Sequence, residues 1–405
     1  MILRLTTTDV AHGGYCVARH DGIVVFVSGA APGEVVEAEV VGQRSRQWYA
    51  RVTHVEQASP DRVVHPWPLS QRTGVGGMDL GHVSVDFGRE WKRRVIQAQL
   101  ARMARLDVDL EVEAAPGDAE WNGLAWRTRV DFRVDDGGRL AMSAAKSHTL
   151  VAIDSMPLAH ERIQAELASA LAEGQADVNP GDTVSYTYAS GSGLARRVRA
   201  ARDSRWGART SPGPASFVTE TVRTPYGNWE YRVSVDGFWQ VHREAPSTLV
   251  TAVLDAVGDV DGPIWDLYAG AGLFTVPLAS RGGGPVTAIE GSAGAVADLR
   301  RNAAELDVQG LAGDVGQVLR QMDRPQADVI VCDPPRFGAG QAVVEQMVRL
   351  DPRAIVYVAC DPAALARDLG LLMSAGYDVA GIRAFDLFPL THHVECVARL
   401  VKPGR

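Results

Sequence analysis

Cys360 has the most reactive setting of the four cysteines in this chain. It follows the apolar run 354–359 and precedes Asp361 and Pro362, residue types favoured at the cap and first position of a helix. Because a helix N-terminus favours negative charge, we predict a lowered pKa and a reactive thiolate for Cys360. The other interpretation is a thiol packed in the core, which is the more frequent role of a lone cysteine.

A thiolate can make a uracil ring reactive. Carbon C5 of uracil is too weakly nucleophilic to attack a methyl sulfonium, but addition of sulfur at C6 produces an enolate whose C5 can attack. A base must then remove the C5 proton so that the thiol is eliminated. The segment 388–395 (FPLTHHVE) offers His392, His393 and Glu395 as candidate bases. For either histidine, a structural hydrogen-bonding role is the more frequent one.

The segment 266–274 (DLYAGAGLF) predicts a nucleotide-cofactor loop between a strand and a helix. Gly270 and Gly272 allow a tight turn and a close approach of the backbone to a ligand. A dinucleotide-binding loop would carry glycine or alanine at position 275, where this chain has Thr275. Together with Asp266, this favours S-adenosylmethionine as the cofactor.

Two acidic residues are expected beside this loop. Glu290 ends the second apolar strand, where a carboxylate can accept hydrogen bonds from ribose hydroxyls, and Asp314 follows the third, near the expected adenine. Either residue alone would more often be a solvated loop acid. Their shared position at successive strand ends favours ligand binding, because open α/β sheets bind ligands at the carboxyl ends of their strands.

A DPPR segment at 333–336 follows another strand, where nucleic-acid methyltransferases place a loop facing the substrate. Adenine-N6 enzymes carry an aromatic residue where this chain has Arg336, and cytosine-C5 enzymes carry a cysteine within the loop. Both features are absent, which favours uracil. Cys332 precedes the loop inside the strand and is expected to be a core thiol.

The elements that must position these residues form an α/β domain over 246–405. Apolar runs at 263–267, 285–290, 328–332 and 354–359 alternate with helical segments, which is typical of a parallel sheet covered on both faces. Two further strands, at 379–385 and 394–401, are joined without room for a full helix. We expect them to form an antiparallel pair at the edge of the sheet.

Two other parts precede this domain. Short alternating strands over 1–58 predict a small β-barrel. Residues 59–245 are expected to begin with an irregular Pro- and Gly-rich segment up to about residue 90, to continue with a helix over 89–106 and to end as an α+β domain with a helix at 161–173. Within it, an arginine strip at 194–209 could hold phosphates and stack on a base; the alternative is a solvated face. The strip comprises Arg196, Arg197, Arg199, Arg202, Arg205, Trp206 and Arg209.

Composition narrows the class of protein. The 405 residues suggest two or three domains, and a net charge of −8 means that any nucleic acid must be held by local basic strips. Cys16, Cys332, Cys360 and Cys396 have no CxxC spacing, so neither a disulfide framework nor a zinc ribbon is indicated. No signal peptide or membrane-spanning run is evident. We expect a monomeric cytoplasmic protein that does not bind membranes.

Taken together, the motifs at 266–272, 333–336, 360–362 and 388–395 resemble the tRNA/rRNA uracil-5-methyltransferase family. The resemblance spans the chain, because 1–58 is similar to the TRAM domain, an oligonucleotide-binding-like barrel. It implies a Rossmann-like class I methyltransferase domain, S-adenosylmethionine as cofactor and tRNA or rRNA as partner. Carried over by motif position, Cys360 would be the nucleophile and Glu395 the general base, with Gln240, Tyr268, Glu290 and Asp333 contacting the cofactor.

The chain departs from the family in several places. His242 and Leu273 stand where family members carry asparagine. Many TRAM-bearing members hold a [4Fe-4S] cluster through four cysteines, and here Pro66 to Pro68, Val75 to Met78 and Ser155 occupy those places. Because such clusters are held by thiolates, we predict that no iron–sulfur cluster is bound. The remaining alternative from another class is an RNA-binding protein of the same fold that has lost turnover.

Overall fold

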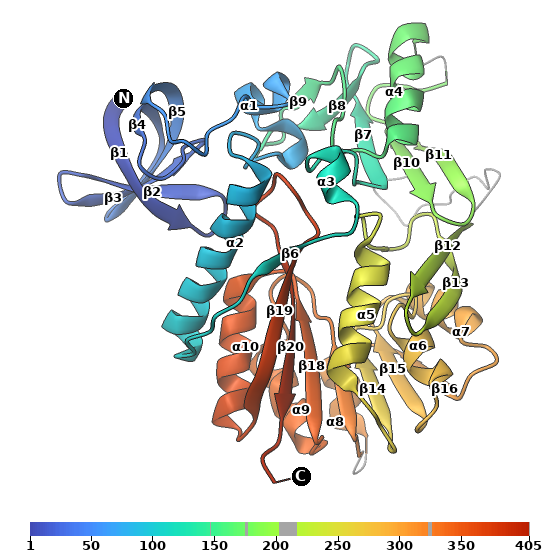
Figure 1. The fold of residues 1–405 in the computed structure, drawn as a ribbon. Coiled ribbons are helices and arrows are strands. Elements are labelled where there is room, and N and C mark those ends of the chain that lie inside the picture. Colours follow the sequence, from blue (N-terminus) through green and yellow to red (C-terminus); the bar gives the residue numbers. More distant parts are fainter. Residues whose placement is uncertain (146, 175–176, 202–216, 323–325, 405) are drawn as a thin grey trace.

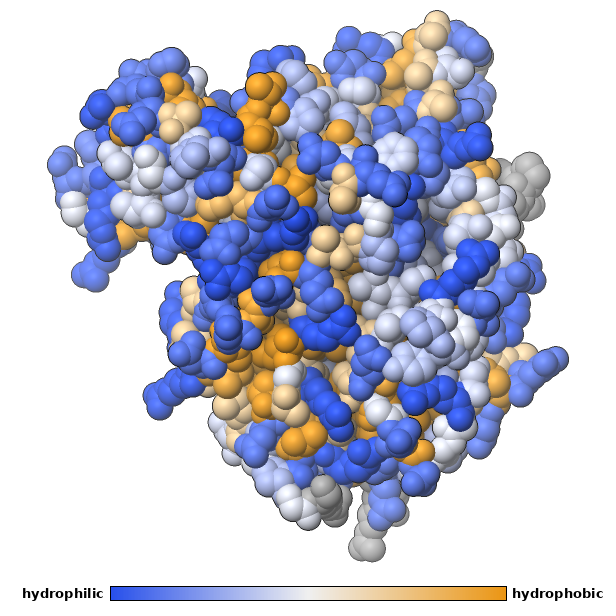
Figure 2. Space-filling view, in the orientation of Figure 1, coloured by the Kyte–Doolittle hydropathy of each residue, from blue (hydrophilic) through white to orange (hydrophobic). Residues whose placement is uncertain are grey.

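The structure is a computed structural model that describes residues 1–145, 147–174, 177–201, 217–322 and 326–404. Figure 1 shows three parts: a barrel formed by the N-terminus, a central region, and a C-terminal sheet with helices. The barrel projects from the rest of the molecule as a separate lobe, and hydrophilic residues dominate the visible face (Figure 2). Within the described ranges, no helix is both long and apolar enough to cross a membrane.

The predicted N-terminal barrel is confirmed. Its strands alternate buried and exposed residues, as in β1, where Leu3 and Leu5 point into the core and their neighbours face solvent. The strands follow the order β1-β2-β3-β5-β4 and close on themselves. Their bounds are Ile2–Ala11 (β1), Tyr15–His20 (β2), Ile23–Ser28 (β3), Val35–Arg44 (β4) and Gln47–Gln57 (β5).

Helix α2 (Val85–Gln99) joins the barrel to the rest of the chain. Trp91 and Val95 pack into the barrel core, whereas Ile96 and Leu100 pack against the C-terminal sheet. The helix begins four residues before the predicted start, because Ser84 caps it by accepting a hydrogen bond from the amide of Phe87. A π-helical turn, Leu100–Ala104, ends it. The segment predicted to be irregular also contains a short helix, α1 (Pro68–Thr73).

The central region contains a five-stranded antiparallel sheet of order β11-β10-β7-β8-β9 and a hairpin of β12 and β13. Three arginines of the predicted strip lie on β11, where Arg196, Arg197 and Arg199 pair with Asp177, Asp236 and Asp131. These ion pairs favour the solvated-face interpretation for this part; Arg202, Arg205, Trp206 and Arg209 lie outside the described residues. The bounds are Arg129–Val134 (β7), Leu140–Ser143 (β8), Leu150–Ala152 (β9), Thr183–Ala189 (β10), Gly193–Arg199 (β11), Phe217–Thr224 (β12), Gly227–Ser234 (β13), Asp118–Trp121 (α3) and Glu161–Glu173 (α4).

The C-terminal domain is built on an eight-stranded sheet of order β16-β15-β14-β17-β18-β20-β19-β6. The first five strands are parallel, and every residue of β18 is buried, as expected for a sheet covered on both faces. Helix α5 packs on one face, and α2, α9 and α10 pack on the other. The bounds are Val112–Ala114 (β6), Ala245–Val257 (α5), Ile264–Leu267 (β14), Thr275–Ser280 (α6), Val286–Glu290 (β15), Ala293–Asn302 (α7), Val308–Ala312 (β16), Val315–Gln321 (α8), Val329–Cys332 (β17), Gly340–Arg349 (α9), Ala354–Ala359 (β18), Pro362–Ser374 (α10), Asp378–Asp386 (β19) and Glu395–Val401 (β20).

The two last strands form the predicted antiparallel pair, but the prediction that this pair lies at the edge of the sheet is wrong. Strands β19 and β20 do pair antiparallel, but β20 lies between β18 and β19. Strand β19 is not an edge either, since β6 pairs parallel with it. The connection of β19 and β20 therefore leaves the sheet next to the end of β18, and it rises toward the junction of the three parts (Figure 1).

Candidate active site

Cys360 and Glu395 lie opposite each other at the same end of two neighbouring strands, β18 and β20. Strands β18 and β20 are antiparallel, with Ala359 paired to Cys396. One step further along this register brings Cys360, just after β18, to Glu395, the first residue of β20. Their proximity is also evident in their electrostatics, because the Glu395 carboxylate acts to raise the pKa of the Cys360 thiol.

The predicted turn around Cys360 is confirmed. The Asp361 carboxylate caps α10 by accepting hydrogen bonds from the amides of Ala363 (3.0 Å) and Ala364 (2.8 Å), and Pro362 takes the first helical position. The other three cysteines are buried, which confirms the prediction of a core thiol for Cys332.

The predicted lowering of the Cys360 pKa is wrong for the chain without ligands. Burial raises the pKa of this thiol to about 12, and the negative charges of Glu395 and Asp333 add to the effect. Arg336 acts in the opposite direction but only offsets part of it. The helix N-terminus is present, yet it is outweighed by desolvation and by neighbouring carboxylates.

Two acidic groups of the site are also shifted toward the neutral form. Burial raises the pKa of Glu395 well above its usual range, and the charge of Asp333 raises it further. Burial likewise raises the pKa of Asp333, at the end of β17, to about 7. Arg336 of the same loop is exposed and favours the charged forms of both Cys360 and Glu395.

The glycine-containing loop after β14 turns through left-handed backbone conformations. Tyr268 has φ 64°, an uncommon value for a residue with a side chain, and Gly270 and Gly272 have φ 56° and 95°. The Tyr268 amide donates to the carbonyl of Ile289 at 2.9 Å, which fixes the loop to the neighbouring strand β15. The backbone is thus forced outward at the carboxyl edge of the sheet, where such strained positions commonly serve ligand binding.

Glu290 holds this loop from the end of β15. Its carboxylate accepts hydrogen bonds from the amide of Gly270 (3.0 Å) and from the amide of Ser292 (2.7 Å). Asp314 follows β16, is exposed, and caps α8 by accepting from the amide of Gln317 at 2.9 Å. Tyr268 lies close enough to Asp314 for the carboxylate to contribute, after burial, to a raised pKa of the phenol. Tyr268, Glu290 and Asp314 therefore follow three adjacent strands at one edge, as predicted.

Asp266 is a buried acidic residue that has one carboxylate oxygen free to accept a hydrogen bond. Its side chain is inaccessible to solvent, and one oxygen accepts a hydrogen bond from the hydroxyl of Thr275 at 2.5 Å. The other oxygen, Oδ1, has no hydrogen-bond partner. Burial raises the pKa of Asp266 to about 7. Thr275, which replaces the small residue of a dinucleotide loop, therefore serves as the partner of Asp266.

Gln240 lies in the connection between β13 and α5. It is 8% exposed, and the preceding Trp239 packs its ring on Tyr231 with centroids 5.1 Å apart. The Tyr231 hydroxyl donates to the carbonyl of Leu273 at 2.9 Å, so this connection is attached to the glycine-containing loop. His242 is buried and pairs with Asp118 at 3.1 Å, which gives it a structural role.

The segment before Glu395 is held by Lys92 and Asp79, neither of which belongs to a recognised motif. Lys92 of α2 forms a buried ion pair with Asp386 and donates to the carbonyl of Phe388 at 3.0 Å. His392 lies 2.6 Å from the carboxylate of Asp79 through its Nδ1 atom. Burial and the neighbouring His392 lower the pKa of His393 to about 3, so it is neutral at physiological pH. No sequence signal identified these partners, because each is brought in from a distant segment.

A tryptophan packs where a resident cluster would require sulfur ligands. Trp67 is 2% exposed, and a side chain added at Gly76 would lie 2.1 Å from its ring. Val75 and Met78 belong to the same buried cluster. Among the residues that the structure describes, no group of three or more histidine, cysteine or acidic side chains could hold a metal ion. This packing does not fit an iron–sulfur cluster.

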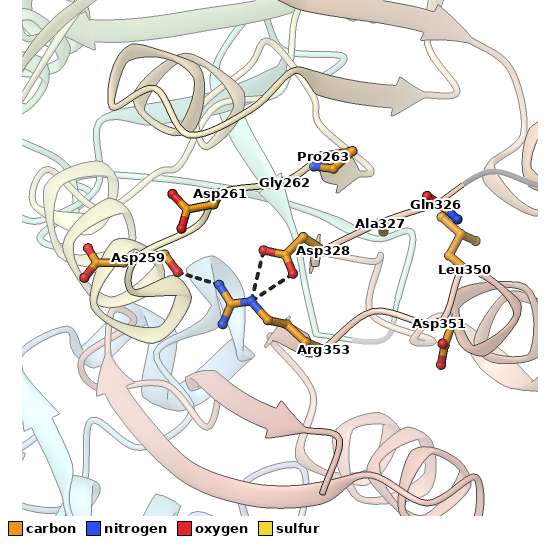
Figure 3. Close-up of a pocket in the computed structure, with 10 residues that line it drawn as sticks. All are labelled: Asp259, Asp261, Gly262, Pro263, Gln326, Ala327, Asp328, Leu350, Asp351 and Arg353. Atoms are coloured by element: carbon orange, nitrogen blue, oxygen red, sulfur yellow. Dashed lines mark hydrogen bonds and ion pairs between the residues drawn. The ribbon is translucent and has the colours of Figure 1, made fainter. Parts of the chain in front are cut away.

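A cavity lies at the other ends of the strands, before β14, β17 and β18 (Figure 3). Arg353 crosses it and binds both carboxylate oxygens of Asp328 at 2.9 Å, and it also donates to the carbonyl of Asp259. Asp261 and Asp351 complete its acidic lining. Because ligands of such sheets bind at the carboxyl ends of the strands, this cavity is not the site described above.

Comparisons with known proteins agree with this geometry. Residues 318–402, which include Asp333, Cys360 and Glu395, match the family model described as tRNA (Uracil-5-)-methyltransferase. Residues 242–355 match the model described as Methyltransferase small domain. An uncharacterised RNA methyltransferase of Bifidobacterium longum is 38% identical over 411 residues, which covers 96% of this chain and 94% of that protein.

Two further relatives extend the comparison. An uncharacterised RNA methyltransferase of Streptomyces avermitilis is 39% identical over 431 residues and covers 96% of each chain. The structure of Pyrococcus abyssi tRNA (uracil-54, C5)-methyltransferase in complex with S-adenosyl-L-homocysteine has a TM-score of 0.73 and 23% identity, and covers 98% of this chain and 100% of that one. This last likeness shows a shared fold. The chain is an RNA methyltransferase and belongs to the tRNA/rRNA uracil-5-methyltransferase family.

Proposed function

We propose that the protein methylates C5 of a uridine in tRNA or rRNA, with Cys360 as nucleophile and Glu395 as general base. The observation that carries this proposal is the placement of these two residues opposite each other at adjoining strand ends. A thiol and a carboxyl group on one edge of the sheet are the two groups that C5 methylation requires. The family membership of the chain supports the same reaction.

We propose S-adenosylmethionine as the methyl donor, with Gln240, Tyr268, Glu290, Asp314 and Asp333 as contacts. The residues fit such a ligand, because acceptors follow three adjacent strands at the edge where the backbone turns outward. The unpartnered Oδ1 of Asp266 beneath the loop is a further polar group that a bound ligand or its water could satisfy. The cofactor supplies an electrophilic methyl group.

The protein residues then carry out two changes at the uracil ring. The Cys360 thiol gives its proton to solvent, and the sulfur forms a bond to C6 while the electron pair of the C5–C6 double bond moves toward O4. After C5 has taken the methyl group, Glu395 in its carboxylate form removes the C5 proton. The electron pair of that bond restores the double bond, and the bond from sulfur to C6 breaks. Arg336 favours the charged form of both residues, which supports its placement beside the reacting ring.

The test is methyl transfer to RNA from a strain that lacks the gene, measured by mass spectrometry of nucleosides. We expect the native chain to produce 5-methyluridine and Cys360→Ala to produce none. Cys16→Ala is the matched control, because Cys16 is a buried thiol of the barrel and should be dispensable. Full activity of Cys360→Ala would refute the proposed function. Binding of RNA by the native chain without any methyl transfer would instead favour the RNA-binding alternative.

We also propose that the barrel of residues 1–58 and the central region of residues 59–245 bind the RNA, and that residues 246–405 carry the chemistry. No iron–sulfur cluster is part of this proposal, because Trp67 packs directly on Gly76 where cluster ligands are missing. Iron analysis after anaerobic purification checks this point. Stoichiometric iron in a brown protein would contradict it.

A further inference from the structure

The turn between β1 and β2, residues 12–14, reaches from the barrel to the turn that carries Cys360. Atom Nε2 of His12 lies 3.3 Å from Oδ2 of Asp361. The other oxygen of this carboxylate accepts the amides of Ala363 and Ala364 at the start of α10. His12 therefore completes the set of partners of the capping residue that immediately follows the nucleophile.

The same turn also contacts the segment that leads to Glu395. The ring of His12 packs edge-on against His392, with centroids 6.2 Å apart. His392 in turn binds the Asp79 carboxylate through its amide (3.1 Å) and Nδ1 (2.6 Å). A side chain added at Gly14 would lie 2.4 Å from this carboxylate, so only glycine permits so close an approach. One turn of the barrel thus touches the segments that carry both reacting groups.

The charge of Asp361 explains why its partner matters. Next to Cys360, this carboxylate raises the pKa of the thiol and so opposes formation of the thiolate. Burial acts against the charged carboxylate, but the hydrogen bond from His12 and the two amide bonds hold the pKa of Asp361 below its usual value. A donor at Oδ2 fixes the carboxylate in its capping position and offsets part of its charge near the sulfur.

We propose that His12 is a positioning residue for the attack of Cys360, and that it makes the reactive turn depend on the docked barrel. The inference rests on the function proposed above. It differs from a role in RNA binding, because His12 would act through Asp361 and not through a contact with the substrate. Loss of His12 should therefore lower the rate of the chemical step and leave RNA affinity nearly unchanged.

The attack step can be measured alone in a Glu395→Gln background. Without the base, sulfur addition and methyl transfer occur but elimination does not, so the covalent complex of protein and RNA accumulates and is scored on denaturing gels. The probe is bulk RNA from a strain that lacks the gene. We expect His12→Ala to slow formation of this complex about tenfold, as is common when a reacting group loses its orientation.

Steady-state kinetics of the otherwise native enzyme provide the second readout. We expect His12→Ala to lower kcat about tenfold with KM for RNA changed less than about twofold, and His12→Gln to recover part of kcat because its amide can still donate to Asp361. The matched control is His20→Ala. His20 lies on the same hairpin with a similarly exposed side chain, 34% against 39%, and its acidic neighbour is Asp21 at 3.6 Å. The His20→Ala variant should leave kcat unchanged.

Three outcomes would overturn the inference: an unchanged kcat for His12→Ala, an effect confined to KM, or an equal loss of kcat for His20→Ala. If His12→Ala does not fold, His12→Gln takes its place and must show a lowered kcat with an unchanged KM. Failure of the proposed function is separate, because it would appear as full activity of Cys360→Ala.

Discussion

Burial disfavours the charged forms of both reacting groups. Burial raises the pKa of the Cys360 thiol to about 12, and it raises the pKa of Glu395 as well. In the proposed mechanism both groups act in their charged forms, the thiolate as nucleophile and the carboxylate as base. In the free chain the Cys360 thiol is therefore less reactive than the predicted thiolate, and the charge of Arg336 favours ionisation of both groups.

The first prediction concerns pH. Below pH 12, the thiolate fraction of Cys360 rises tenfold for each pH unit, because the thiol is the form that dominates below its pKa. We therefore expect kcat/KM for RNA to increase with a slope of about one in a logarithmic plot between about pH 6 and pH 9. Initial rates in buffers of constant ionic strength check this. A flat profile would mean that ionisation of Cys360 does not limit the reaction of the free enzyme.

The second prediction concerns Glu395. Replacement by Gln keeps the size of the side chain but removes the base, so kcat should fall by about 10²- to 10⁴-fold. The methylated adduct should persist on denaturing gels only in this variant. Asp361→Asn is a useful comparison, because it also removes an acidic group beside Cys360 but leaves the base in place. An adduct that accumulates equally in both variants would contradict the assignment of Glu395.

Among the elements, α2 and β20 explain how distant segments come together at the site. Helix α2 places Lys92 against Asp386, where both side chains are almost completely buried, at 1% and 2% exposure. A buried ion pair costs desolvation, and removing one partner leaves an uncompensated charge in the core. Lys92 also holds the carbonyl of Phe388, at the start of the connection to Glu395.

The third prediction follows from this pair. Lys92→Met should destabilise the protein by about 3 to 5 kcal/mol, whereas the double variant Lys92→Met with Asp386→Leu should recover most of the loss because no buried charge remains. Urea denaturation of the three proteins measures the effect. The exposed pair of Arg4 and Glu56 is the control, and Arg4→Met should cost less than about 1 kcal/mol. Equal destabilisation by the single and double variants would contradict the argument.

Local sequence patterns predicted the individual strands and helices of the site better than they predicted which elements lie beside one another. The apolar run before Cys360 and the Asp-Pro pair after it predicted β18 and the cap of α10, because these features depend on adjacent residues. The insertion of β20 between β18 and β19 was not predicted, since strand order depends on contacts between distant segments. For the same reason no local pattern indicated that Glu395 would raise the pKa of Cys360 or that His12 would contact Asp361.

The C-terminal sheet is completed by elements from outside residues 246–405. Strand β6 pairs with β19, and Ile96 and Leu100 of α2 pack in the core on one face of the sheet. On the other face, Tyr231 and Val233 of β13 pack with α5. The predicted boundary near residue 246 therefore does not enclose the whole hydrophobic core that supports the C-terminal sheet.

The fourth prediction tests this arrangement. A fragment of residues 246–405 leaves β19 as an unpaired edge and exposes the apolar surface that α2 and β13 cover, which favours aggregation. A fragment of residues 85–405 retains α2, β6 and β13 and should unfold cooperatively. Its melting temperature should be lower than that of the full chain, because the face of α2 that packs on the barrel is exposed. Circular dichroism melting and gel filtration compare the two. A fragment of residues 246–405 that is monodisperse and melts as high as the longer fragment would show that the domain is self-sufficient, and that the contacts across residue 246 contribute little to its stability.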